Sequence, residues 1–179
     1  MNNVTLPNTK SSTIAIIGLG YVGLPLAVEF AKEKSTKNGL YSRKVIGFDT
    51  NKKRVDDLKN NIDLTNEISS KALTQAKNLE IYSSPLIIND ADIFIVTVPT
   101  PITIDNNPDL DALISATKTV AKALISRKDR CKPIIIYEST VYPGTTEEIC
   151  VPILEKISNL VFNKDFFCGY SPERINPGD

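Results

Sequence analysis

The sequence predicts an α/β fold in which helices cover both faces of a doubly wound parallel sheet. Short apolar runs alternate with stretches of helical periodicity along the whole chain. Within the runs, apolar residues follow one another instead of alternating with polar ones, which is typical of strands buried on both faces. A turn rich in glycine, at 18–23, lies between the first run and the first helical stretch.

Three strands and three helices are expected in the first half of the chain, after a polar and flexible arm at residues 1–12. The strands are expected at TIAIIG (13–18), KVIGFD (44–49) and LEIYSS (79–84). Helices are expected from Tyr21 to about Lys34, at 51–60 and from Glu67 to Lys77, with a loop at 35–43.

The second half adds three strands and two helices. The strands are expected at DIFIVTV (92–98), PIIIY (133–137) and DFFCGY (165–170). A helix is expected from Leu110 to about Leu124, with Asp109 as its cap. Thr145 and Glu148 have the spacing of a capping box, which predicts a helix from there to about Lys156.

Length and charge restrict what the protein can be. A chain of 179 residues fits one domain, which we place at 13–179. Its 21 basic and 21 acidic residues are scattered and leave no net field for nucleic acid or an anionic membrane. The first dozen residues lack the pattern of a signal peptide, and no apolar run reaches the length of a membrane span. We therefore expect a cytoplasmic protein without nucleic-acid or membrane partners.

Cysteine and histidine usage disfavours several kinds of site. Cys131, Cys150 and Cys168 are far apart without a CxxC pair, and the chain has no histidine. This pattern argues against a zinc site and a disulfide framework, so no metal is expected. Without histidine there is no Ser-His or Cys-His catalytic pair. Each cysteine adjoins an apolar run and is interpreted as a small buried apolar side chain.

The glycine turn, GLGYVG, matches the GxGxxG pattern and stands where a dinucleotide site requires it, between a strand and a helix. Gly18 permits the tight turn, Gly20 lets backbone N–H groups approach a pyrophosphate, and Gly23 lets the helix pack closely on the strand. The positive end of the helix dipole then faces the phosphates. This context favours a Rossmann-like fold over a turn whose glycines serve only the backbone conformation.

Asp49 ends the second expected strand, at the distance where an acidic residue binds the adenosine ribose. A carboxylate there repels the 2′-phosphate of NADP, so NAD is the expected cofactor. Arg54 leaves an alternative open, because a guanidinium can accept a phosphate or can simply be a solvated helix residue.

Three polar segments follow strands and should meet at the carboxyl edge of the sheet, where ligands bind. They are VPTPI at 98–102, where a strand ends near Val98, EST at 138–140, and SPER at 171–174. Pro99 and Pro101 also suit a strand end, and Ser139 with Thr140 suits a turn. The shared edge favours a functional role for Glu173, and for Thr140 it supports such a role at least as well as a simple turn.

Together, GLGYVGLPLA, VPTP, ESTVYPG and SPERINPGD make the chain resemble the NAD-binding domain of the UDP-glucose and GDP-mannose dehydrogenase family, from about Thr13 to Asp179. The segment SPERINPG at 171–178 is most similar to that of one branch of this family. Enzymes of this branch oxidise UDP-N-acetylglucosamine or UDP-N-acetylgalactosamine to the uronic acid, for surface polysaccharide biosynthesis such as capsule or O-antigen.

The resemblance implies that two NAD molecules in turn take hydride from C6 of a UDP-sugar, through a cysteine thioester that water hydrolyses. It implies that Thr140 places that water and that Glu173 is the general acid/base. It also implies a homodimer or higher oligomer. The implied cofactor-binding residues are Gly18, Leu19, Gly20, Tyr21, Val22, Gly23, Asp49, Arg54, Val98, Pro99, Thr100, Pro101, Ser139 and Thr140. The implied substrate-binding residues are Glu173, Arg174, Ile175 and Asn176.

Two departures from the family pattern matter. UDP-glucose dehydrogenases carry a second glutamate four residues after the first, where this chain has Pro177, which favours an N-acetylhexosamine substrate. The family's nucleophilic cysteine and its partner lysine come after a long central helix, and none of the three cysteines here occupies that motif. The chain is therefore interpreted as a fragment, truncated before that helix and the UDP-sugar-binding domain, which binds NAD without completing catalysis.

Three alternatives remain at this stage. The full enzyme can be a UDP-glucose or GDP-mannose 6-dehydrogenase. The chain can be a stand-alone NAD-binding module without chemistry of its own. It can also be a structural interaction domain that binds no NAD.

Overall fold

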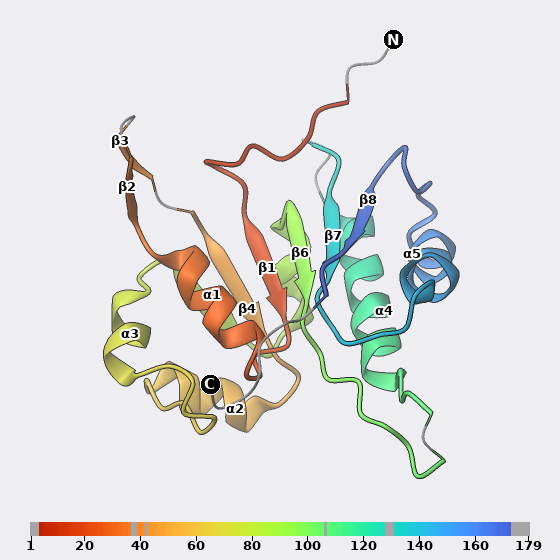
Figure 1. The fold of residues 1–179 in the computed structure, drawn as a ribbon. Helices are drawn as coiled ribbons and strands as arrows, with labels where there is room; N and C mark the ends of the chain where they lie inside the picture. The colour runs from red at the N-terminus through yellow and green to blue at the C-terminus, as the bar shows by residue number, and fades with distance from the viewer. Residues whose placement is uncertain (1–3, 37–38, 42, 106, 128–130, 173–179) are drawn as a thin grey trace.

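The computed structural model describes residues 4–36, 39–41, 43–105, 107–127 and 131–172 of the chain. Its centre is a six-stranded sheet, in the order β5-β4-β1-β6-β7-β8, and all neighbouring strands are parallel (Figure 1). The strands are β1 (Ile14–Ile17), β4 (Val45–Phe48), β5 (Leu79–Tyr82), β6 (Ile93–Val96), β7 (Ile134–Tyr137) and β8 (Phe167–Tyr170).

The order of the strands makes the sheet doubly wound. From β1 in the middle, the chain first builds outward through β4 and β5, then returns to the other side of β1 and builds outward through β6, β7 and β8. The direction reverses between β1 and β6, and such a reversal opens a crevice at the carboxyl ends of the two strands. The Rossmann-like fold predicted from the sequence is confirmed.

Two groups of helices cover the sheet, one group on each face. Helices α1 (Gly23–Ala31), α2 (Lys52–Lys59) and α3 (Ser70–Gln75) pack on the face that carries Ile14 and Ile16 of β1. The opposite face, with Ala15 and Ile17 of the same strand, is covered by α4 (Asp111–Ser126), α5 (Val151–Ser158) and the 3₁₀ turn η1 (Pro85–Asp90). Both faces of β1 and β4 are fully buried, which explains why these strands are unbroken apolar runs.

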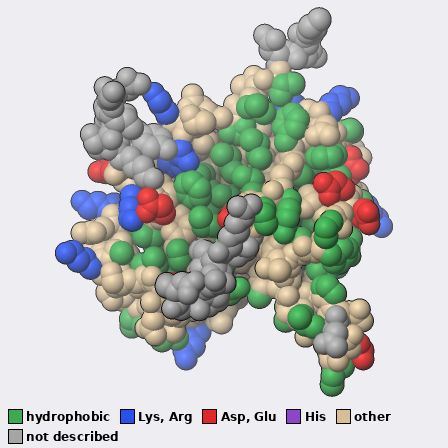
Figure 2. Space-filling model, in the orientation of Figure 1, with side chains coloured by type: hydrophobic (Ala, Val, Ile, Leu, Met, Phe, Trp, Pro, Cys, Tyr) green, Lys and Arg blue, Asp and Glu red, His purple; other side chains and the backbone are tan. Residues whose placement is uncertain are grey.

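On the face that carries Ile14 and Ile16, the strands beside the helices are less completely buried. Figure 2 shows hydrophobic side chains gathered over the β6–β7–β8 half of this face, with charged ones mostly at the margins. Ile134 and Ile136 of β7 are only partly buried there. Among the described residues, no helix is long and apolar enough to cross a membrane.

Three expectations about local structure were wrong. An antiparallel hairpin, β2 (Lys34–Thr36) and β3 (Gly39–Tyr41), replaces the expected end of the first helix and part of the loop at 35–43. The helix is correspondingly shorter, since Lys32 is already extended. The capping box at Thr145 does not form, because this residue has helical backbone angles and its Oγ1 donates to the Tyr142 carbonyl at 2.7 Å. The π-helical turn η2 (Thr146–Cys150) follows, and α5 begins only at Val151.

Hydrogen bonds join the described part of the N-terminal arm to the domain. The Lys132 N–H donates to the Thr5 carbonyl at 2.8 Å, and the Arg43 guanidinium donates to the Thr9 carbonyl. The flexibility of residues 1–12 and the boundary at Thr13 stay predictions.

A buried ion pair joins the residue before β6 to the residue after α4, at the amino ends of the strands. Arg127 Nη2 lies 2.8 Å from Asp92 Oδ1, and the two side chains are only 4% and 8% exposed. Arg127 also donates to the Ala91 and Cys131 carbonyls, and Asp92 accepts the Thr13 N–H at 2.9 Å. The pair thus ties four chain segments together.

Arg127→Met is expected to lower the free energy of unfolding by about 3 kcal/mol, because it removes a guanidinium that pairs with a buried carboxylate. Urea denaturation of both proteins measures this difference. Lys132→Met is a matched control. Lys132 Nζ and Asp165 Oδ1 are 3.8 Å apart, and the two side chains are 31% and 27% exposed. An ion pair that water reaches contributes less than about 1 kcal/mol to stability. Equal effects of the two substitutions would contradict this account.

Candidate nucleotide-binding site

Two adjoining cavities, of about 390 and 400 Å³, lie at the carboxyl ends of β1, β4, β6 and β7. Both are lined by Gly20, Thr97, Val98 and Pro99, so they form one cleft around the glycine loop. The first cavity adds Tyr21, Val22, Thr100, Pro101, Glu138, Ser139 and Thr140. The second adds Ile17, Gly18, Phe48, Asp49, Thr50, Ala112, Ser115, Ala116 and Thr119. The cleft therefore occupies the crevice that the strand order predicts.

The three glycines of the loop are required for different reasons. Gly18 has a φ of +98°, which side chains with a Cβ rarely adopt. A Cβ on Gly23 would clash with the Gly18 carbonyl and Thr97 Oγ1, so glycine there permits the close approach of α1. A Cβ on Gly20, in contrast, would meet no protein atom within 4 Å. Since Gly20 lines both cavities, the space it leaves open belongs to the cleft.

Side chains from three other segments hold the glycine loop by its backbone. Asp49 Oδ2 accepts the Leu19 N–H at 2.8 Å, and Arg54 Nε donates to the Leu19 carbonyl at 3.0 Å. Thr97 Oγ1 donates to the Gly18 carbonyl at 2.8 Å from the end of β6. The loop is thus fixed before any ligand binds, which lowers the entropic cost of binding.

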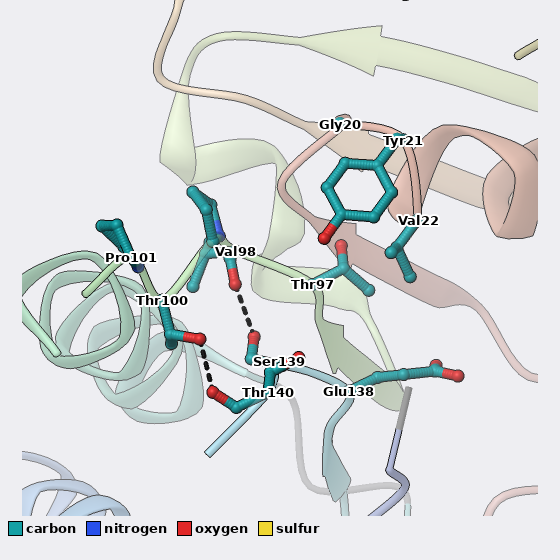
Figure 3. Close-up of a pocket in the computed structure, with 11 residues that line it drawn as sticks. Gly20, Tyr21, Val22, Thr97, Val98, Thr100, Pro101, Glu138, Ser139 and Thr140 are labelled. Atoms are coloured by element: carbon teal, nitrogen blue, oxygen red, sulfur yellow. Dashed lines mark hydrogen bonds between the residues drawn. The ribbon is translucent and has the colours of Figure 1, made fainter. Parts of the chain in front are cut away.

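Hydrogen bonds also join the loops after β6 and β7, which form one wall of the first cavity (Figure 3). Ser139 Oγ donates to the Val98 carbonyl at 2.7 Å, and Thr100 Oγ1 donates to the Thr140 carbonyl. The two loops therefore behave as one unit, and the Tyr21 ring extends over the cavity from the glycine loop.

The structure brings most of the predicted site residues together. The cleft and the loops around it include Asp49 and the predicted residues at 18–23, 98–101 and 139–140. The roles of these residues stay predictions. Arg54 contacts the loop but lines neither cavity. Glu173, Arg174, Ile175 and Asn176 lie outside the described residues.

Several cleft residues were not singled out from the sequence. Thr97 directly follows β6 within the apolar run 92–98, where a threonine is easily interpreted as core. The helix α4 contributes Ala112, Ser115 and Thr119 to the second cavity, and only its packing shows which face turns toward the cleft. Glu138 stands next to the predicted Ser139 and Thr140, so its position after a strand was an available signal.

The three cysteines are not among the residues that line the cleft. Burial raises the pKa of the Cys131 and Cys150 thiols and raises that of Cys168 to about 12. Thiols with raised pKa values are poor nucleophiles at neutral pH, which agrees with their interpretation as packing residues. Across the described residues, no group of three or more Cys, Asp or Glu side chains could hold a metal ion.

The cleft suits a dinucleotide. The open space at Gly20 and the N-terminus of α1 can take a pyrophosphate, and the Asp49 carboxylate borders the second cavity, where an adenosine ribose would lie. If the pyrophosphate lies at the residues that line both cavities, the first cavity remains free for the nicotinamide half of the cofactor.

Known proteins share both sequence and fold with this chain. It is 54% identical over 166 residues to a UDP-N-acetyl-D-glucosamine 6-dehydrogenase from Salmonella typhi, which covers 93% of this chain and 36% of the relative. An enzyme of the same name from Pseudomonas aeruginosa is 49% identical, over 95% of this chain and 37% of its own length. The structure of a UDP-D-ManNAc dehydrogenase from Pyrococcus horikoshii, 32% identical, superposes with a TM-score of 0.77 over 93% of this chain and 37% of that chain.

The chain thus spans just over a third of the length of these relatives. The family model for the UDP-glucose/GDP-mannose dehydrogenase NAD-binding domain matches residues 12–179, which include the whole sheet and the cleft. The chain belongs to the UDP-glucose/GDP-mannose dehydrogenase family and is its NAD-binding domain.

Proposed function

We propose that the protein containing this chain is an NAD-dependent 6-dehydrogenase that oxidises C6 of UDP-N-acetylglucosamine or UDP-N-acetylgalactosamine to the uronic acid, for surface polysaccharide biosynthesis. The observation that carries this proposal is the difference in identity among relatives. Two relatives named UDP-N-acetyl-D-glucosamine 6-dehydrogenase are 54% and 49% identical. Five relatives named UDP-N-acetyl-D-mannosamine dehydrogenase are only 31–35% identical. Protein CapL from Staphylococcus aureus is 52% identical to this chain.

The cleft residues divide the work of holding the cofactor. The backbone around Gly20 and the start of α1 receive the pyrophosphate, and Asp49 accepts hydrogen bonds from the adenosine ribose. The fixed loops that carry Val98 and Ser139 border the nicotinamide half. NAD, when bound, accepts the hydride that leaves C6 of the sugar.

Thr140 and Glu173 are proposed to act on water. Thr140 is exposed at the wall of the first cavity, on the loop held by Thr100, and there it can orient a water molecule by its hydroxyl. Glu173 follows the last strand by three residues and is proposed as the general acid/base toward that water. Arg174, Ile175 and Asn176 are proposed to contact the substrate.

The nucleophile is proposed to come from outside this chain. The three cysteines here do not line the cleft, and the relatives extend well beyond the matched segment. Residues 1–179 alone should therefore bind NAD but not turn over. We also propose that the whole protein is a cytoplasmic homodimer or higher oligomer, which light scattering after size-exclusion chromatography tests.

The reaction is tested by supplying the protein, as its gene encodes it, with NAD and a panel of nucleotide sugars. Two NADH should form for each UDP-N-acetylglucosamine or UDP-N-acetylgalactosamine consumed, with kcat/KM at least about tenfold above those for UDP-glucose and GDP-mannose. Residues 1–179 alone serve as the control and should form no NADH continuously. A preference for UDP-glucose or GDP-mannose would reject the substrate proposal, and sustained turnover by residues 1–179 would reject the external nucleophile.

A further inference from the structure

A second buried ion pair stands beside the glycine loop. Arg54 Nη1 lies 2.7 Å from Asp63 Oδ1, and the two side chains are 10% and 1% exposed. Arg54 Nη2 donates to Thr65 Oγ1 at 3.3 Å, while Nε donates to the Leu19 carbonyl. All three guanidinium nitrogens of Arg54 therefore have partners within the protein.

Asp63 is the centre of a small network in the segment between α2 and α3. Its two carboxylate oxygens accept the backbone N–H groups of Thr65, Glu67 and Ile68 at 2.9–3.0 Å, and the Thr65 hydroxyl at 2.7 Å. Burial by itself would raise the pKa of Asp63, but hydrogen bonds from Thr65, Ile68 and Arg54 outweigh it and lower this pKa. Asp63 is thus a fixed negative charge at neutral pH.

The ion pair is connected directly to the ribose-binding carboxylate. Arg54 holds the carbonyl of Leu19, and Asp49 holds the N–H of the same residue. The guanidinium and the Asp49 carboxylate are therefore anchored to one residue of the loop. A guanidinium in this neighbourhood is the ordinary partner of an adenosine 2′-phosphate. In this chain, Asp63 is already paired with that guanidinium.

We propose that Asp63 is a positioning residue that selects NAD over NADP. It holds Arg54 against the glycine loop and engages the guanidinium that a 2′-phosphate would need. With Asp63 ionised, one cation stands beside two carboxylates, so the charge near the ribose is net negative and repels the phosphate. A neutral side chain at position 63 can still accept a hydrogen bond from Arg54, but it no longer neutralises the guanidinium, whose positive charge is then free to attract a 2′-phosphate.

Asp63→Asn separates this role from simple structural support. The substitution keeps the size of the side chain and removes its charge. The affinity for NAD should fall several-fold because the loop loses part of its support, whereas the affinity ratio of NADP to NAD should rise about tenfold. Titration calorimetry with NAD and with NADP, at one ionic strength, measures both constants.

Two comparisons decide whether Arg54 mediates the effect. Asp56→Asn removes one negative charge from an exposed position on α2 and should leave the ratio unchanged. Arg54→Met with Asp63→Asn should lose the rise, since the guanidinium that meets the phosphate is gone. A rise that persists without Arg54 would overturn the proposal. Equal losses for NAD and NADP in Asp63→Asn would also overturn it, because they indicate support alone.

A milder variant covers the case in which Asp63→Asn fails to fold. Thr65→Val removes one hydroxyl that contacts both Asp63 and Arg54, and should shift the ratio in the same direction by a smaller factor. An unchanged ratio in a folded Thr65→Val, with Asp63→Asn unfolded, would count against the proposal. These titrations involve no sugar, so they remain decisive even if the proposed substrate is wrong.

Discussion

Gly20→Val should remove measurable NAD binding while leaving the domain folded. A Cβ at Gly20 meets no protein atom within 4 Å, and its φ lies outside the left-handed region, so the folded chain tolerates a side chain there. The same space is where the loop must approach the pyrophosphate closely. A valine keeps the phosphates away from the backbone N–H groups, and each lost charge-assisted hydrogen bond costs about 1.5–3 kcal/mol. Losing two of them raises Kd at least about a hundredfold.

Gly169→Val is the matched control for this experiment. A Cβ on Gly169 in β8 also meets no protein atom within 4 Å, but this residue lines neither cavity. Calorimetric titration with NAD should therefore separate the two variants, while thermal melting followed by circular dichroism should show both as folded. NAD binding by Gly20→Val with the affinity of the unsubstituted protein would show that the cleft is not the cofactor site.

The contrast between Gly20 and Gly23 also shows how much the sequence could predict. The GxGxxG spacing with a preceding apolar run was enough to place the loop, since few other arrangements need three glycines at that point. The strands were predicted for a similar reason, because sheets buried on both faces leave unbroken apolar runs such as Ile14–Ile17. The expected cap Asp109 was one residue too early, because Leu110 is the N-cap residue and has no side-chain cap, although Asp109 Oδ1 accepts the Asp111 N–H at 2.9 Å.

What the sequence did not reveal depends on contacts between distant segments. Asp63 lies in a polar stretch that resembles any solvated loop, and only the fold shows its burial against Arg54. The strands Lys34–Thr36 and Gly39–Tyr41 have little apolar alternation, although the sequence carries an Asn-Gly dipeptide at 38–39, which is typical of tight hairpins. Thr145 has the residue type and spacing of a cap, but its hydroxyl is used by a local turn. Local sequence patterns therefore predicted most helices and strands, but they did not predict which side chains contact one another.

The last strand connects the described structure to the proposed acid/base. Strand β8 pairs with β7 so that Tyr170 stands opposite Tyr137, and the Ser171 N–H continues this ladder to the Tyr137 carbonyl at 2.9 Å. Tyr137 immediately precedes the Glu138-Ser139-Thr140 segment that lines the first cavity. The chain therefore reaches the cleft edge at Ser171, two residues before the proposed acid/base in the sequence.

Glu173→Gln, in the protein as its gene encodes it, should lower kcat about a hundredfold or more, because a general acid/base contributes about 10²–10⁴ to a rate. If this carboxylate acts on the water that hydrolyses the thioester, hydride transfer still precedes the blocked step. Rapid mixing should then show a burst of NADH no larger than two per active site, followed by slow turnover. NAD affinity should not change, and Glu147→Gln, at an exposed position of η2, should retain the full rate. A normal steady-state rate in Glu173→Gln would remove this residue from the mechanism, whereas a slow rate without a burst would assign it to an earlier step than hydrolysis.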